Sequence, residues 1–364
     1  MATHLQEFTI HDYKGIHELK LSSLNSINIL TGDNNCGKTS VLELLSTVEN
    51  PQYTDSWILC TRMQNILSRN RLYYNGFYHM FSIDNNDKII SYEYIDKDNN
   101  SNHIVLKADF ETMQISEREM YKINGFHRTE NQKNDNEILD TTCMHLYTYS
   151  NNQLINKDSI YDFQTLLSKS GNKKKAFIKT MYVSPVDHAQ GTIFLDEIMS
   201  DPELYEELIH ILKEFDDSIL SVNAINNTAT PFSTEYKILT KKHEKALPLS
   251  SYGDGMKKAL LLLSAIVSSR NGILLLDEFE TAIHTSAMDS IFSWLLRSAR
   301  KLNVQVFLTS HSKEAINKLL RVDATLQPYI NLYTLYDYNG KNYVRMMNCF
   351  DAINAQDNLG LELR

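Results

Sequence analysis

Long apolar runs are missing from this sequence of 364 residues, so we expect no membrane-spanning helix and no membrane partner. The opening residues, MATHLQEFTI, lack the basic start and apolar stretch of a secretory signal, which favours a cytoplasmic protein. Cysteine is scarce and shows no CxxC spacing, which indicates reduced thiols and argues against a disulfide framework or a zinc site. The four positions are Cys36, Cys60, Cys143 and Cys349.

An excess of basic residues is also missing. Lys and Arg number 36 against 45 Asp and Glu, which gives a formal net charge of -9 at pH 7. This balance argues against a protein that coats nucleic acid over its whole surface, although it does not exclude a local basic patch. The content of 42% hydrophobic and 22% charged residues is ordinary for a globular domain. The sequence therefore excludes a wholly disordered, collagen-like or coiled-coil chain.

Apolar spacing predicts strands and helices near both ends of the chain. Residues 5–21 predict a strand, a turn at Lys14 and Gly15, and a second strand, and residues 26–30 predict a buried strand before a helix. Towards the C-terminal end, helices alternate with buried strands, which favours a parallel sheet. We divide the chain into four segments: the N-terminal half of a head (1–50), a variable β-rich insert (51–180), a helical and strand segment that rejoins the head (181–248) and the C-terminal half of the head (249–364).

A glycine-bearing loop lies between a predicted strand and a predicted helix. Residues 32–39, GDNNCGKT, satisfy the pattern G-x-x-x-x-G-K-[ST], in which backbone N–H groups surround phosphate oxygens and the helix dipole faces the same charge. Lys38 is expected to reach the terminal phosphates and Thr39 to ligate Mg²⁺. Cys36 is expected to fill space in the loop and not to act as a nucleophile. The nucleotide-binding residues predicted here are Gly32, Asn34, Asn35, Cys36, Gly37, Lys38, Thr39 and Ser40.

Two carboxylates follow a second buried strand. Residues 273–276, ILLL, precede Asp277 and Glu278, and the carboxyl ends of strands are where ligands bind in open α/β sheets. Adjacent buried carboxylates repel each other, so a metal ion gives a good reason for them. We expect Asp277 to hold Mg²⁺ and Glu278 to act as general base on the attacking water.

Two further motifs complete the predicted site. Residues 249–255, LSSYGDG, open a helix, and we expect Ser251, Gly253 and Gly255 to form an anion site there. One triphosphate does not need two helix ends from one chain, so this second end is expected to bind the nucleotide of a neighbouring protomer. His311 ends the strand VQVFLTSH and is predicted to contact the terminal phosphate or the attacking water as a catalytic residue, together with Lys38 and Glu278.

The order of these motifs resembles that of an ABC-type ATPase head. It is most similar to the SMC and RecF-like branch, and within it to the OLD-type ATPases of bacterial phage-defence systems. The opening IHDYKGIHELKL and the loop GDNNCGKTSVLE also resemble that branch. The resemblance covers residues 5–48 and 249–320 and, loosely, 181–222. It implies an α/β fold, an ABC-type P-loop head whose mixed central sheet is flanked by helices, with ATP and Mg²⁺ as cofactors.

The resemblance also assigns roles to residues that their own pattern leaves open. It implies that His284 lies in a loop that contacts the partner across a dimer, that Lys14 lies near the nucleotide, and that His311 is a switch histidine. Gln190, in VSPVDHAQG, is a candidate for the Q-loop glutamine of such heads. Tyr252 and Asp254 stand where transporter subunits carry Gly and Gln, which argues against a transporter.

The function expected from the sequence is a slow ATPase that forms a homodimer or higher homo-oligomer through shared ATP. The short stretch after His311 leaves no room for a Toprim nuclease, so we expect a separate nuclease or toxin to act in trans in antiphage defence. One alternative is a scaffold that binds nucleotide and hydrolyses little. Another is a RecF-like DNA-repair clamp that binds duplex DNA through local basic residues: Lys173, Lys174, Lys175, Lys179, Lys241, Lys242, His243 and Lys245.

Overall fold

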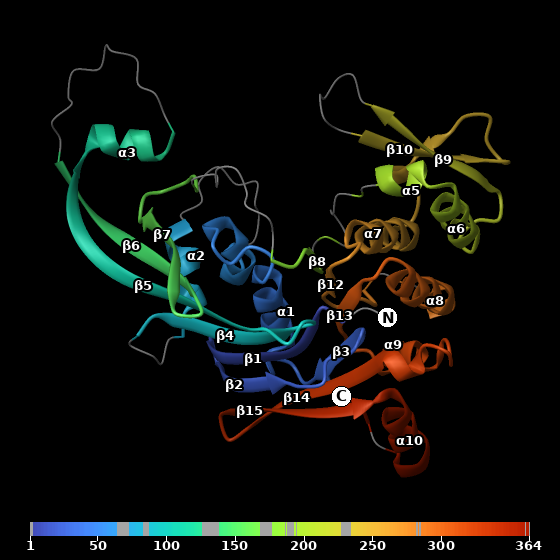
Figure 1. Cartoon of the computed structure of the whole chain (residues 1–364). Helices are drawn as coiled ribbons and strands as arrows, with labels where there is room; N and C mark the ends of the chain where they lie inside the picture. Colours follow the sequence, from blue (N-terminus) through green and yellow to red (C-terminus); the bar gives the residue numbers. More distant parts are fainter. Residues whose placement is uncertain are drawn as a thin grey trace.

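The computed structural model describes most of the chain, and Figure 1 shows its elements coloured by sequence. Within the described part, no helix is both long and apolar enough to cross a membrane. The described residues form two six-stranded sheets and one three-stranded sheet. The described residues are 3–63, 73–82, 87–125, 138–167, 177–185, 187, 193, 195–226, 234–281, 283, 285–360 and 362–363.

A mixed six-stranded sheet forms the centre of the head, in the order β15-β14-β3-β13-β12-β8. The pairs β8–β12, β12–β13, β13–β3 and β3–β14 are parallel, and β15 returns antiparallel to β14 at the edge. Every residue of β3, β12 and β13 is buried, as expected for strands covered on both faces. The bounds are β3 Ile27–Gly32, β8 Thr180–Val183, β12 Ile273–Leu276, β13 Gln305–Thr309, β14 Ile330–Tyr338 and β15 Lys341–Asn348.

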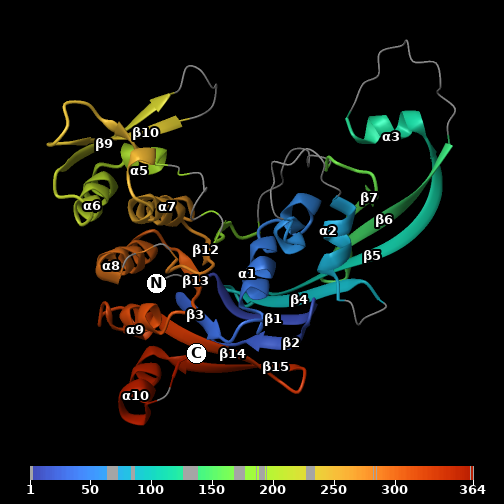
Figure 2. The ribbon, with the colours of Figure 1, turned by 180° about the vertical axis from the view of Figure 1, so that it is seen from behind.

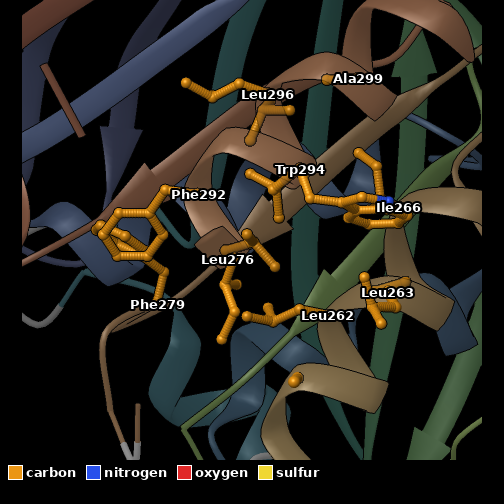
Figure 3. Packing of buried hydrophobic residues seen from close by; sticks show 14 of the residues in the cluster. Leu262, Leu263, Ile266, Leu276, Phe279, Phe292, Trp294, Leu296 and Ala299 are labelled. Carbon is orange, nitrogen blue, oxygen red and sulfur yellow. The ribbon is translucent and has the colours of Figure 1, made fainter. Parts of the chain in front are cut away.

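Helices cover both faces of this sheet, which confirms the predicted fold class. Because side chains alternate along a strand, Leu274 and Leu276 pack in one core with α7, α8 and α9, whereas Ile273 and Leu275 pack in a second core with α1. Figure 3 shows Leu276 among apolar side chains of the first core. The bounds are α1 Lys38–Thr47, α7 Asp254–Ser268, α8 Thr285–Lys301, α9 Lys313–Arg321 and α10 Cys349–Leu359.

A second six-stranded sheet is antiparallel throughout, in the order β2-β1-β4-β5-β6-β7. The predicted strand, turn and strand at the start of the chain are present as β1 and β2, and β4 pairs directly with β1. Figure 2 shows α1 and α2 beside this curved sheet, and their apolar side chains share its core. The bounds are β1 Leu5–Tyr13, β2 Ile16–Leu21, β4 Ile89–Asp96, β5 Ser101–Ser116, β6 Ile138–Ser150, β7 Gln153–Tyr161, α2 Tyr73–Met80 and α3 Glu117–Ile123.

A small three-stranded sheet, in the order β11-β10-β9, precedes the second half of the head. Helix α6 begins at Pro202 because the Asp201 carboxylate accepts hydrogen bonds from the N–H groups of Glu203 and Leu204. The chain then passes through a short 3₁₀ turn into α7. The bounds are α5 Asp196–Ser200, α6 Pro202–Lys213, β9 Ile219–Asn226, β10 Thr234–Thr240, β11 Leu247–Pro248, and the 3₁₀ turns η1 Thr54–Trp57, η2 Leu59–Thr61, η3 Leu249–Ser251 and η4 Gln327–Tyr329.

Candidate nucleotide-binding site

The loop between β3 and α1 depends on glycine at both predicted glycine positions. Gly32 has φ 134° and Gly37 has φ 96°, values that favour glycine. A Cβ atom on Gly32 would lie 2.0 Å from the backbone oxygen of Leu335, and one on Gly37 would lie 2.7 Å from Cδ1 of Ile16. Asn35 also has a positive φ, of 64°, which asparagine tolerates better than most residues. The backbone of β14 therefore leaves no room for a side chain at Gly32, and the positive φ is what favours glycine at Gly37.

Lys38 lies at the centre of this loop. Its Nζ donates hydrogen bonds to the backbone oxygens of Gly32 at 2.8 Å and Asp33 at 2.7 Å, and it lies 3.5 Å from Sγ of Cys36. The side chain is only 5% exposed. These acceptors are neutral, so no carboxylate among the described residues is hydrogen-bonded to this buried cation. Such a position is suited to a phosphate anion.

Asp277 and Thr39 meet at the carboxyl end of β12. Oδ1 of the buried Asp277 accepts hydrogen bonds from Oγ1 of Thr309 at 2.5 Å and from Oγ1 of Thr39 at 3.3 Å. Its Oδ2 accepts a hydrogen bond from the hydroxyl of Tyr182 on β8 at 3.1 Å. Burial, followed by the charge of Asp277, raises the pKa of Tyr182, so this hydroxyl remains a donor. The structure thus brings together the two predicted metal ligands, Thr39 and Asp277.

The donor set at this position fits Mg²⁺. A hydroxyl and a carboxylate are hard oxygen ligands, and Mg²⁺ is commonly bound by one or two protein groups, with waters and substrate phosphates as the other ligands. Among the residues that the structure describes, no group of three or more His, Cys, Asp and Glu side chains could hold a metal ion by itself. The residues whose positions would suit Mg²⁺ are Thr39 and Asp277, beside the loop of residues 32–39, and their role as ligands stays a prediction.

Glu278 follows directly and has an unusual backbone. Its φ of 48° lies in the left-handed region, which costs a non-glycine residue roughly 1–3 kcal/mol, so the surrounding structure must hold it there. Its N–H donates to Oγ1 of Thr309 at 2.8 Å, and the N–H of Phe279 donates to the backbone oxygen of Thr309 at 3.2 Å. Thr309 therefore stabilises the turn in which Glu278 lies, just after the end of β12. The motif T-S-H contained this threonine, but its spacing gave no reason to assign it a role.

Glu280 joins the ends of two neighbouring strands, and sequence reasoning missed it. Its Oε1 accepts hydrogen bonds from the N–H groups of His311 at 3.0 Å and Ser312 at 3.2 Å. His311 lies just beyond β13, as predicted, and its side chain is exposed. Its contact with a phosphate stays a prediction. Glu280 thus fixes the backbone that carries His311 to the loop that carries Glu278.

Lys14 contacts the helix that follows the phosphate loop. Its Nζ donates to Oε2 of Glu43 at 3.0 Å, and burial lowers its pKa. The buried Glu43 also accepts from the hydroxyl of Tyr13 and from Nε of Arg62 at 2.6 Å. Arg62 extends this network to the loop, since its Nη2 donates to Oγ of Ser40 at 2.9 Å. The nucleotide contact of Lys14 stays a prediction, and Arg62 is a basic residue that no sequence motif indicated.

The remaining predicted residues lie at the start of α7 or outside the described residues. Ser251 ends η3, Gly253 caps α7, and Gly255 lies in the first turn of that helix, so the motif does open a helix. Ser251 and Gly253 are exposed, and a Cβ atom on Gly253 would meet nothing within 4 Å. This helix end is therefore open to a ligand or another chain. His284 and Gln190 lie outside the described residues.

Comparison with known proteins assigns the family. Residues 27–317 match the family model described as "AAA domain, putative AbiEii toxin, Type IV TA system". The chain belongs to this family of AAA-type ATPase domains. A relative from Helicobacter pylori named "ATP/GTP phosphatase" is 24% identical over 334 residues, which cover 87% of this chain and 88% of the relative. An uncharacterized protein of Methanocaldococcus jannaschii is 33% identical over 113 residues, 31% of this chain and 98% of that protein.

Solved structures show the same fold. An SMC head bound to the C-winged helix domain of ScpA matches 97% of this chain and all of that chain, with a TM-score of 0.51 and 11% identity. An SMC head with an extended coiled coil from Pyrococcus furiosus matches 98% of this chain and all of that chain, with a TM-score of 0.52 and 9% identity. The chain therefore has the fold of an SMC-type ATPase head.

Proposed function

We propose that this protein hydrolyses ATP to ADP and phosphate with slow turnover. The observation that carries the proposal is the meeting of Thr39 and Asp277 beside the loop that contains Lys38, with Glu278 as the next residue. Membership of the AAA-type family supports it. So does the relative from Helicobacter pylori, whose name describes phosphatase action on ATP or GTP.

Each residue has a role that follows from its position. Lys38, released from the carbonyls of Gly32 and Asp33, contacts the terminal phosphates. Thr39 and Asp277 would hold Mg²⁺, which when bound would neutralise charge on the phosphate oxygens. Glu278 accepts a proton from water as the water oxygen bonds to the γ-phosphorus and the bond to the ADP oxygen breaks. Thr309 orients the carboxylate of Asp277 and holds the backbone of Glu278.

The same proposal includes an ATP-switched assembly. The exposed start of α7, with Ser251, Gly253 and Gly255, would bind the γ-phosphate held by a second protomer, and His284 would contact that protomer. ATP would then favour a homodimer or higher homo-oligomer, and hydrolysis would release it. A separate nuclease or toxin would read this change in antiphage defence, as the resemblance to OLD-type ATPases implies. The SMC head solved with a ScpA domain gives an example of such a head with a protein partner.

The DNA-repair clamp has less support. Lys173, Lys174 and Lys175 lie outside the described residues. Lys242 forms an ion pair with Asp216 at 3.0 Å, so part of the second basic cluster is already neutralised. The rest of that cluster is exposed: Lys241, His243 and Lys245. We therefore keep DNA binding as an alternative that salt-dependent binding of duplex DNA would support.

Phosphate release from ATP by wild type and by the Glu278→Gln variant tests the proposed reaction. The Gln side chain keeps the size of Glu278 but cannot accept the proton, so we expect a loss of about a hundredfold or more in kcat. Glu244→Gln is the matched control, because Glu244 is exposed and lies between β10 and β11, outside the proposed site. This variant should hydrolyse ATP like wild type. Equal rates for wild type and Glu278→Gln would refute hydrolysis by this site.

A further inference from the structure

Two lysines at the start of α7 have opposite surroundings. Lys257 forms an ion pair with Asp254 at 3.2 Å near the surface. Lys258 is completely buried, and its Nζ has no hydrogen-bond partner among the described residues. A buried ammonium without a partner is strongly destabilising, because it loses water and gains nothing in return. The burial of Lys258 therefore does not contribute to the stability of the arrangement seen here, which indicates another role for this side chain.

Glu280 has a buried carboxylate oxygen that also lacks a hydrogen-bond partner among the described residues. Its Oε1 accepts the N–H groups of His311 and Ser312, but its Oε2 is buried and has no donor among the described residues. Desolvation lowers the pKa of Lys258 to about 7, and the charges of Glu280, Glu278 and Asp187 oppose this, with Glu280 the strongest of the three. Opposite buried charges thus act on each other without an ion pair in this structure.

Lys258 and Glu280 lie on the two parts of the chain that would contact nucleotide in the proposed function. Lys258 lies one turn beyond Gly255, on the helix whose exposed start would bind the partner's phosphate. Glu280 lies in the loop of Glu278 and holds the backbone of His311. A direct contact between them would connect the start of α7 to both loops at the carboxyl edge of the central sheet.

We propose that Nζ of Lys258 and Oε2 of Glu280 form a buried ion pair when nucleotide engages the head, and that this pair positions the loops of Glu278 and His311 for hydrolysis. The inference rests on the proposed function. Pairing satisfies two polar atoms that are otherwise unpaired, so it favours the nucleotide-engaged arrangement over the one seen here. Lys258 is a positioning residue in this scheme, since it acts through Glu280.

A double-mutant cycle on the full chain tests the pair. The variants are Lys258→Met, which keeps the length of the side chain, Glu280→Gln, which keeps an oxygen for the two N–H groups, and the double variant. Lys257→Met is the matched control on the neighbouring residue, and Lys258→Arg tests whether a different cation restores the contact. Each protein is measured for kcat and KM with ATP, and for thermal unfolding with and without a non-hydrolysable ATP analogue.

The expected result is a fall of about tenfold in kcat for each single variant, with KM changed less than twofold and the double variant no worse than either single. Without nucleotide, Lys258→Met should unfold at a higher temperature than wild type, because an unpaired buried charge is gone. Lys258→Arg should recover part of kcat, and Lys257→Met should behave like wild type. A protein held together by Lys258 for structural reasons alone would instead unfold at a lower temperature.

Additive losses in the cycle, or wild-type kcat in Lys258→Met, would overturn the ion pair and leave the proposed ATPase intact. If wild type hydrolyses no more ATP than Glu278→Gln, the proposed reaction fails, and the pair is then judged by unfolding. In that case the rise in unfolding temperature with the ATP analogue should be smaller in both single variants than in wild type. An equal rise in all of them would overturn the pair as well.

Discussion

The hydroxyl of Thr309 donates a hydrogen bond of 2.5 Å to Oδ1 of Asp277, across the parallel pair β12–β13. Oγ1 of Thr309 also accepts a hydrogen bond from the N–H of Glu278 at 2.8 Å. One side chain from the neighbouring strand therefore orients the proposed metal ligand and stabilises the left-handed turn of the proposed base. This arrangement fixes the carboxylate of Asp277 and the backbone of Glu278 at the end of a buried strand.

Replacing Thr309 by valine should test that relationship. Valine keeps the β-branched shape but loses the hydroxyl, so Oδ1 of Asp277 loses a donor and the N–H of Glu278 loses an acceptor. We expect a loss of about 1–3 kcal/mol in the free energy of unfolding, as for a buried polar group left unpaired. We also expect kcat for ATP to fall about tenfold or more, because Glu278 is no longer fixed.

Urea unfolding and phosphate release measure these two effects. Thr325→Val is a suitable control, because Thr325 donates a hydrogen bond to Asp323 on the exposed surface and lies outside the site. That variant should change the free energy of unfolding by less than about 0.5 kcal/mol. Equal behaviour of the two variants would show that Thr309 has no special role.

Replacing Lys38 by alanine should abolish nucleotide binding. The change removes the buried ammonium from the loop, and a triphosphate would then meet the loop without its main compensating charge. Titration with a fluorescent ATP analogue measures binding, and Lys20→Ala removes a surface lysine that pairs with Glu7 as the control. Unchanged affinity in Lys38→Ala would contradict the assignment of this loop to phosphate.

The parts of the site that the sequence predicted depend on short-range patterns. The loop of residues 32–39 and the carboxylates at 277 and 278 were identified by local spacing after a predicted strand. The structure confirms that each lies at the end of a strand. Tyr182 could not be predicted, because its contact with Asp277 requires β8 to pair with β12 from nearly a hundred residues earlier in the sequence, and strand partners are not encoded in local pattern. The contact between Arg62 and Glu43 could not be predicted for a similar reason, since Arg62 lies in a segment without a motif.

The β-rich insert shows the same limit. The predicted β-rich insert, residues 51–180, contains the strands β4 to β7. The sequence did not indicate that these strands continue the sheet begun by β1 and β2, with Phe8 opposite Tyr94. The family assignment is also broader than the resemblance, since the AAA-type family is shown and the OLD-type relationship stays a prediction.

Glu278→Gln is expected to accumulate an ATP-bound dimer or higher oligomer. The variant can bind ATP through Lys38 but cannot complete hydrolysis, so the contact between one protomer's nucleotide and the partner's α7 persists. Size-exclusion chromatography with ATP and Mg²⁺ should show a larger species that is missing without ATP. The double variant Lys38→Ala, Glu278→Gln should elute as the nucleotide-free protein does. Elution of Glu278→Gln as a monomer with bound ATP would refute the shared-site assembly.

Substituting alanine for Gly32 should damage the site through the backbone. A Cβ atom there would lie 2.0 Å from the backbone oxygen of Leu335, and φ of 134° is unfavourable for alanine, so the loop or β14 must move.

Gly340→Ala is the matched control, because its φ of 71° carries strain but a Cβ atom meets nothing within 4 Å. We expect Gly340→Ala to lose about 1 kcal/mol of stability and to keep ATP binding. Gly32→Ala should lose more stability and bind ATP at least about tenfold more weakly, since β14 presses directly against the phosphate loop. Equal ATP affinity in the two variants, measured by titration alongside urea unfolding, would show that the close approach of Leu335 does not control the loop.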